Sequence, residues 1–212
     1  MSTVRAESEH CKICFDALWA RLRHQPTRHF EQTDSLPLFV TWKKDGRLRG
    51  CIGNLSPIPF PQGLVEYAIR AGLHDSRFDP IMETEFSRLT VGVSLLVDFI
   101  PDRAWDDWEV GLHGIVMRFD HHDQHYKAVF LPEVASEQGW TKRQTIEALA
   151  KKSGFQGRID QNLLAKIKIE SFVSSKAEMT YSEWLEEHAK TEETNHLQTA
   201  SNTTRQNNAL FM

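Results

Sequence analysis

Cys51 is the residue of this sequence with the clearest potential for chemistry, because Arg49 lies two positions before it in a predicted β-strand. Side chains two apart on a strand share a face, so the guanidinium is expected beside the sulfur. Nearby positive charge stabilises the thiolate, which is the reactive form of cysteine. The opposite, core-facing side of this strand is then predicted to consist of Leu48, Gly50 and Ile52. Cys51 is therefore a candidate nucleophile.

Two glycines, Gly50 and Gly53, flank this cysteine. Glycine inside a strand loses packing and usually marks a bulge or the close approach of another backbone or a ligand. The pattern thus combines a reactive group with access to it. The alternative is a buried, inert thiol, since free cysteine packs in most sheets as a small hydrophobe.

The motif LRGCIGN at residues 48–54, preceded by PLFVTWK at 37–43, resembles the signature of the AMMECR-one family, named after a chromosomal region linked to Alport syndrome, midface hypoplasia and elliptocytosis. Further blocks resemble the family in the same order: DSRF at 75–78, VSLL at 93–96, WEVGLHG at 108–114, LPEVA at 131–135 and EQGW at 137–140. The resemblance spans roughly Cys14 to Leu185 and is closer to eukaryotic than to archaeal members.

This resemblance implies a fold divided into a larger and a smaller lobe. It does not imply one activity, because the biochemical activity of the family is not established. Bacterial and archaeal relatives occur with Memo-like and radical-SAM partners, which is consistent with an enzymatic context.

The composition is that of an ordinary globular protein, with 212 residues, 40% hydrophobic and 25% charged. No apolar run approaches the ~20 residues that span a bilayer, so no membrane partner is expected. The first residues lack the apolar stretch of a secretory signal, and three cysteines cannot form a closed disulfide framework. A cytosolic or nuclear location is therefore predicted. The net charge of -4 disfavours nucleic acid as a partner, although a local basic patch could still bind it.

Hydrophobic periodicity and turn residues predict an α+β fold, in which helices cover a mostly antiparallel sheet of about five or six strands. The expected helices are 10–24, 62–72, 142–152 and 181–189, and the expected strands are 38–43, 48–54, 91–97, 113–119, 125–131 and 165–172. The proline-rich segment 56–61 is expected to be a loop. One domain is predicted over residues 1–189. The polar tail 190–212 is expected to be disordered, because it has too few apolar groups to offset its ordering entropy.

Cys11 and Cys14 have the CxxC spacing of redox and zinc sites. No second pair follows, and both sulfurs fall on the apolar stripe of the first predicted helix, with Phe15 and Leu18. A structural role is therefore predicted for both. No metal and no cofactor is expected.

Asp75 and Arg77 are the second constellation, in a loop that also contains His74 and Ser76. In the structural interpretation, Asp75 caps the following turn and Arg77 pairs with a carboxylate. In the functional interpretation, this loop reaches Cys51. The family motif covers Asp75, Arg77 and Phe78 but not His74, which argues against His74 as a general base.

The remaining candidates are histidines and the basic hairpin. His113 is expected to line a pocket that Glu133 and Glu137 face. The cluster of His121, His122 and His125 is expected to be a solvated loop. Among the basic residues around the hairpin, Lys43 and Lys44 are expected to be solvated at the turn, and an anion contact is expected for Arg49, because Arg49 lies inside the LRGCIGN motif.

Two functions remain open from the sequence. In the first, a cleft lined by the LRGCIGN strand and residues 75–78 binds a small anionic or nucleic-acid-derived ligand, with Cys51 as candidate nucleophile. The ligand-binding residues are then Arg49, Gly50, Gly53, Asp75, Arg77 and His113. In the second, the chain is a non-catalytic module that binds a protein partner, and Cys51 is structural.

Overall fold

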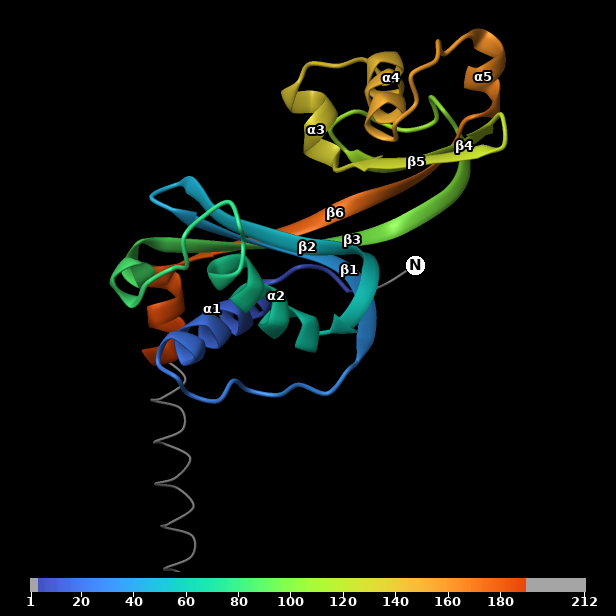
Figure 1. Ribbon diagram of the computed structural model, residues 1–212. Coiled ribbons are helices and arrows are strands. Elements are labelled where there is room, and N and C mark those ends of the chain that lie inside the picture. The colour runs from blue at the N-terminus through green and yellow to red at the C-terminus, as the bar shows by residue number, and fades with distance from the viewer. Residues whose placement is uncertain (1–3, 190–212) are drawn as a thin grey trace, which may run out of the picture.

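The computed structural model describes residues 4–189, which form an α+β fold on one six-stranded antiparallel sheet with the strand order β2-β1-β3-β6-β4-β5 (Figure 1). The strands are β1 (Asp34–Lys44), β2 (Arg47–Phe60), β3 (Leu89–Ala104), β4 (His113–His121), β5 (Gln124–Phe130) and β6 (Lys168–Thr180). The helices are α1 (Ser8–Leu22), α2 (Gln62–Leu73), the 3-10 helix η1 (Glu83–Arg88), α3 (Pro132–Glu137), α4 (Lys142–Lys152) and α5 (Gln161–Lys166). Residues 181–189 are also helical. The predicted fold class is confirmed, and the predicted tail 190–212 lies outside the described residues.

The long strands β3 and β6 run through two lobes (Figure 1). The larger lobe adds β1 and β2, with α1 and α2 packed on one face of the sheet, and the smaller lobe adds β4 and β5 with α3, α4 and α5. Each lobe has its own buried hydrophobic cluster. Between residues 4 and 189, no helix is long and apolar enough to cross a membrane.

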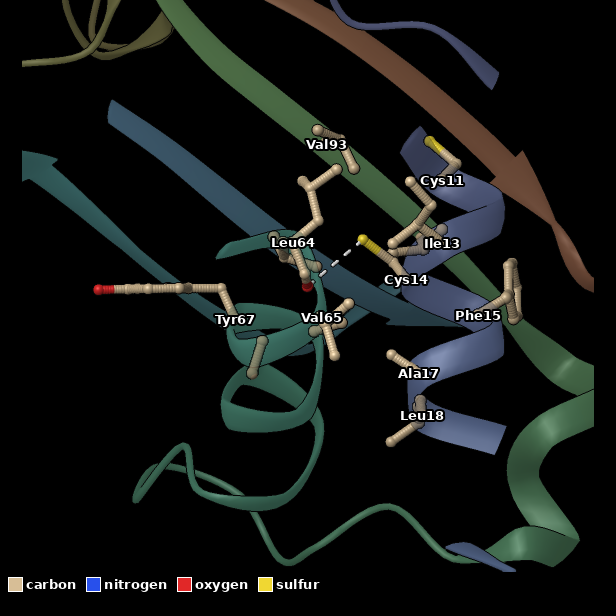
Figure 2. Packing of buried hydrophobic residues seen from close by; sticks show 14 of the residues in the cluster. Cys11, Ile13, Cys14, Phe15, Ala17, Leu18, Leu64, Val65, Tyr67 and Val93 are labelled. Atoms are coloured by element: carbon tan, nitrogen blue, oxygen red, sulfur yellow. Dashed lines mark hydrogen bonds between the residues drawn. The ribbon is translucent and has the colours of Figure 1, made fainter. Parts of the chain in front are cut away.

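Helix α1 buries both of its cysteines in the larger lobe, beside Phe15 and Leu18 (Figure 2). The Cys14 thiol faces the Leu64 carbonyl of α2, with the sulfur 3.9 Å from the oxygen. Burial raises the pKa of Cys11 to about 12 and raises the pKa of Cys14 well above its ordinary value. The two thiols are therefore protonated core groups.

The turn between β1 and β2 forms as the Asp-Gly pair predicts, with positive φ at Asp45 (51°) and Gly46 (75°). The predicted loop at 56–61 is wrong, because β2 continues to Phe60. Pro57 and Pro59 are tolerated because β2 is an edge strand of the sheet formed by residues 4–189, where proline, which has no N–H group to donate, is usually found.

The last predicted strand was placed too early. Residues 161–166 form α5, whose first turn is capped by the Asp160 carboxylate accepting the Leu163 N–H at 2.8 Å, and β6 begins at Lys168. Asp160 is the sequence signal that identifies this helix start. By contrast, the capping box of α4 forms as predicted, between Thr141 and Gln144.

Candidate functional site

The loop that follows α2 folds back onto β2 and holds the main chain of Cys51 from its open side. The Cys51 N–H donates to the Asp75 carboxylate (Oδ2) at 2.9 Å, and Arg77 Nη2 donates to the Cys51 carbonyl at 3.0 Å. Because β2 is at the edge of the sheet, this side chain pair takes the place of a neighbouring strand at Cys51. We call this pair the Asp75–Arg77 clamp.

The clamp is itself an ion pair. Arg77 Nε and Nη2 donate to the two carboxylate oxygens of Asp75 at 2.9 and 2.6 Å. The hydrogen bond from Arg77, with those from the N–H groups of Cys51 and Arg77, holds the Asp75 pKa well below its usual range. Asp75 also accepts the Arg77 N–H at 3.2 Å, so it caps its own turn. The loop therefore has the local capping and pairing expected of a structural role, and it also reaches Cys51, as the functional interpretation requires. His74 is exposed.

Arg49 is paired away from the sulfur. Its guanidinium donates to both oxygens of Glu85, at 3.2 and 3.0 Å, and to the carbonyls of Asp79 and Pro80. Lys44 donates to the same Glu85 carboxylate at 2.5 Å. Burial opposes ionisation of Glu85, but the hydrogen bonds from Arg49 and Lys44 outweigh it and lower its pKa to about 2.

The alternation predicted for residues 48–52 is wrong at its start. A register shift between β1 and β2 follows Trp42, so that Leu48 pairs with Lys43 while Gly50 pairs with Trp42. Leu48 is 47% exposed instead of packing in the core. The hydrogen-bond partner of the Cys51 thiol is Thr41, whose hydroxyl lies 3.1 Å from the sulfur.

The two glycines of the motif lie against protein. A Cβ on Gly50 would lie 1.9 Å from the Ala71 carbonyl of α2, and one on Gly53 would lie 2.2 Å from the Phe39 ring. The close approach expected at these positions therefore involves α2 and β1. In the described residues it leaves no space at Gly50 for a ligand.

A groove with a volume of about 890 Å³ runs between β2 and the loop after α2; we call it the β2 groove. Its walls are Lys44, Arg49, Ser76, Arg77, Phe78, Asp79, Pro80, Met82 and Glu85. The walls thus carry three cationic and two anionic side chains. Arg77 is the most accessible of the paired cations, with its side chain 56% exposed.

Thr41 lines a second, smaller cavity of about 330 Å³ on the opposite face of the sheet from α1 and α2. Glu133 and Glu137 of α3 close this cavity from the smaller lobe, and Lys176 of β6 pairs with Glu133 at 3.3 Å. Cys51 is not among the residues that line this cavity, although its sulfur is hydrogen-bonded to Thr41.

His113 lies apart from these groups. It begins β4 and accepts the Glu109 N–H at 3.0 Å, beside a hollow formed with Arg103, Asp106, Asp107, Trp108 and Lys142. The expectation that Glu133 and Glu137 face His113 is wrong, because both line the Thr41 cavity. The structure brings together Cys51, Asp75, Arg77 and Arg49, but not His113.

No group of three or more histidine, cysteine, aspartate or glutamate side chains within residues 4–189 is arranged to hold a metal ion. The histidines of the β4–β5 turn are surface residues, and His125 bonds to Asp120 at 2.7 Å.

Sequence reasoning missed two residues of the site, Glu85 and Thr41. Glu85 lies three residues after Met82 and accepts its N–H at 3.0 Å, which is the local pattern of a helix start. Its contact with Arg49 joins residues 36 positions apart, and no local pattern shows that. Thr41 pairs with Cys51 only because the register shifts after Trp42, whereas counting from the turn at Asp45 and Gly46 would pair Cys51 with Val40.

Comparison with known proteins gives one consistent result. The AMMECR1 family model matches residues 11–177. The chain is 38% identical to an uncharacterized protein of Arabidopsis thaliana over 191 residues (86% of this chain, 89% of the plant protein). It is 35% identical to one of Schizosaccharomyces pombe over 187 residues (84% and 95%). The crystal structure of an uncharacterized protein from Pyrococcus horikoshii has the same fold, with a TM-score of 0.61 at 23% identity, covering 80% of this chain and 89% of that one.

Proposed function

The chain belongs to the AMMECR1 family, and on that premise we propose that it binds a small anionic ligand, such as a nucleotide or another phosphate derivative, in the β2 groove. The observation that carries the proposal is the Asp75–Arg77 clamp. It fixes the Arg77 guanidinium on the main chain of Cys51 while leaving the side chain accessible from the groove.

Arg77 and Ser76 have hydrogen-bonding capacity left for a ligand. Arg77 uses Nε and Nη2 in the clamp, and within residues 4–189 its Nη1 and the Ser76 hydroxyl make no hydrogen bond. A guanidinium and a hydroxyl are donors that suit a phosphate or carboxylate.

Cys51 is a candidate nucleophile within this proposal, since its thiol is half-buried beside the clamp. Its hydrogen-bond partner is a hydroxyl, and no histidine of residues 4–189 bonds to the sulfur. The geometry therefore supports ligand binding more directly than catalysis.

Binding can be measured with pyrophosphate and AMP, using the rate of iodoacetamide labelling of Cys51 and calorimetry. Saturable binding of at least one of them is expected, with slower labelling. Arg77→Gln should weaken it at least tenfold, because a charged hydrogen bond of about 1.4 kcal/mol or more is lost. Arg77→Lys, which keeps the charge, should lose less. Arg47→Gln removes an exposed arginine outside the groove walls and is the matched control.

Two results would contradict the proposal. One is the absence of saturable binding of both probes to the folded wild type. The other is equal binding by Arg77→Gln and Arg47→Gln, with both variants shown to be folded by circular dichroism.

A specific observation favours the second function, a protein-binding module. Met82 in the groove wall is 62% exposed, and Leu48 on the adjoining strand is also exposed. Apolar side chains bordered by charges are typical of protein-binding surfaces. If this function holds, neither anion binds, and Met82→Ser and Leu48→Ser weaken partner binding without changing the unfolding midpoint.

We also propose a cytosolic or nuclear location. All three cysteines are free thiols, which fits a reducing compartment. Fractionation of cells that express the tagged full chain tests this proposal.

A further inference from the structure

We propose that a second site, in the smaller lobe, binds a small organic molecule that carries phosphate or carboxylate groups. The site is a groove of about 860 Å³, within the usual size range of small-molecule pockets. Helix α4 contributes Arg143, Glu147, Ala150 and Lys151 to one wall, and residues 154–159 form the other. We call it the α4 groove. Helix α4 and the β2 groove lie in different lobes (Figure 1).

The loop that forms the second wall is folded back along α4 by contacts at both of its ends. At one end, the N–H groups of Gly154 and Phe155 donate to carbonyls of the last turn of α4, at 3.1 and 3.0 Å, and Gly154 has a φ of 92°. This is the Schellman ending of a helix, which glycine favours. At the other end, Arg143 in the first turn of α4 donates from Nη2 to the Ile159 carbonyl. The groove therefore has fixed walls.

Three residues of the groove are apolar and almost fully buried. Ala150, Phe155 and Ile159 have exposures of 2%, 6% and 7%. Gly157 passes over the Phe155 ring at a distance that requires glycine, since a Cβ there would lie 2.6 Å from the ring. The loop thus rests on a packed base, and it cannot move inward to close the groove.

Two cations of the walls have no partner. Within residues 4–189, the side chains of Lys151 and Arg158 make no hydrogen bond, ion pair or cation–π contact. Glu147 is the carboxylate of the described walls, and Arg143 Nε already donates to it at 2.7 Å. The walls therefore carry three cationic side chains and one paired carboxylate, which leaves an excess of two positive charges.

The middle of the loop adds donors from the main chain. In the part of the chain that the structure describes, the N–H groups of Gln156, Gly157 and Arg158 make no hydrogen bond. Successive free N–H groups and a guanidinium are donors that proteins use for phosphate and carboxylate oxygens. An isolated surface lysine lacks this combination. The chemical class that fits the α4 groove is therefore a small organic anion with at least two negative charges.

Binding can be measured with fructose 1,6-bisphosphate and citrate, which present the two kinds of anionic group, and with fructose as the uncharged control. Amide chemical shifts of the full chain are followed at constant ionic strength. At least one of the two anions should give saturable shifts at Gly154 and Gly157, with the millimolar or tighter affinity usual for small ligands. The anion that binds more tightly identifies the preferred group. Fructose should give no shift.

Arg158→Gln should weaken anion binding about tenfold and Lys151→Gln roughly threefold, because each change removes a charge and a donor. Both side chains are exposed, so neither change should alter the fold. Lys166→Gln is the matched control, since Lys166 of α5 is exposed, makes no ion pair within residues 4–189 and lies outside the groove. Arg77→Gln, which changes the β2 groove, should leave these shifts unchanged.

Three results would overturn the proposal. The first is the absence of saturable shifts at residues 154–158 up to about 20 mM of either anion, including the case in which shifts occur only at Ser76 and Phe78 of the β2 groove. The second is an equal effect of fructose on the same amides. The third is equal binding of the anions by Arg158→Gln and Lys166→Gln.

Discussion

Gly50 of β2 lies directly against the main chain of Ala71 in α2, so that an added Cβ would be 1.9 Å from the Ala71 carbonyl oxygen. The neighbouring face of α2 is made of small residues, and the Trp42 ring donates to the Ala68 carbonyl at 2.9 Å. Strand and helix therefore meet without an intervening side chain. This contact sets how deeply the motif strand sits above the larger core, and with it the position of Cys51.

Gly50→Ala is predicted to destabilise the protein by roughly 1 to 3 kcal/mol, because the new methyl group cannot fit without moving β2 or α2. Gly92→Ala is the control, since a Cβ there would make an ordinary contact of 3.5 Å with Glu178. That change should stay within about 1 kcal/mol of wild type. Urea unfolding of both variants measures the difference. Equal stabilities would contradict the close contact.

The sequence predicts the structure correctly where the pattern is local. The Asp45-Gly46 turn, the buried stripe of α1 and the glycine contact of β2 each follow from a few adjacent residues. The sequence does not predict the exposure of Leu48, because the register shift after Trp42 changes the alternation of the strand. It does not predict the ion pair of Arg49 either, because Glu85 is distant in sequence. The Thr41 cavity could not be predicted either, since its walls come from β1, β3, β6 and α3.

The pairing of Glu85 with Arg49 and Lys44 should make stability depend on pH. The Glu85 pKa is lowered from 4.5 to about 2, so its contribution is complete above about pH 4.5 and is lost as the pH falls towards 2. At pH 6, Glu85→Gln should be less stable than wild type by roughly 2 to 3 kcal/mol. The difference should shrink steadily between pH 4.5 and pH 2, measured by urea unfolding.

Glu83→Gln is the control for this prediction. Glu83 lies in the same 3-10 helix and pairs with Arg23 at 2.7 Å, but both side chains are half-exposed. Exposed pairs contribute less than about 1 kcal/mol, so this variant should follow wild type at every pH. A constant penalty for Glu85→Gln down to pH 2 would show that its charge is not what stabilises the loop.

The three thiols should differ sharply in reactivity. Cys11 and Cys14 are fully buried with raised pKa values, whereas Cys51 is partly accessible. Iodoacetamide at pH 8 is therefore expected to modify one thiol in the native protein and three in guanidinium chloride, counted by mass spectrometry. Cys51→Ser should abolish native labelling. Rapid native labelling of either α1 cysteine would contradict the core position of these sulfurs.

The Asp75–Arg77 clamp predicts a protected amide where an edge strand would otherwise be open to water. The Cys51 N–H donates to Asp75 at 2.9 Å, so its hydrogen exchange should be slow in wild type. Asp75→Ala should raise its exchange rate at least tenfold, because the amide then faces solvent without an acceptor. Asp79→Ala is the control, since Asp79 lies in the same loop and bonds to Arg49 only through its carbonyl. Amide exchange measured by NMR distinguishes local from global opening. If the amides of Trp42 and Val40 in β1 exchange faster in Asp75→Ala by the same factor as the Cys51 amide, the clamp stabilises the whole sheet. Rapid exchange of the Cys51 amide in wild type would show that the hydrogen bond does not persist in solution.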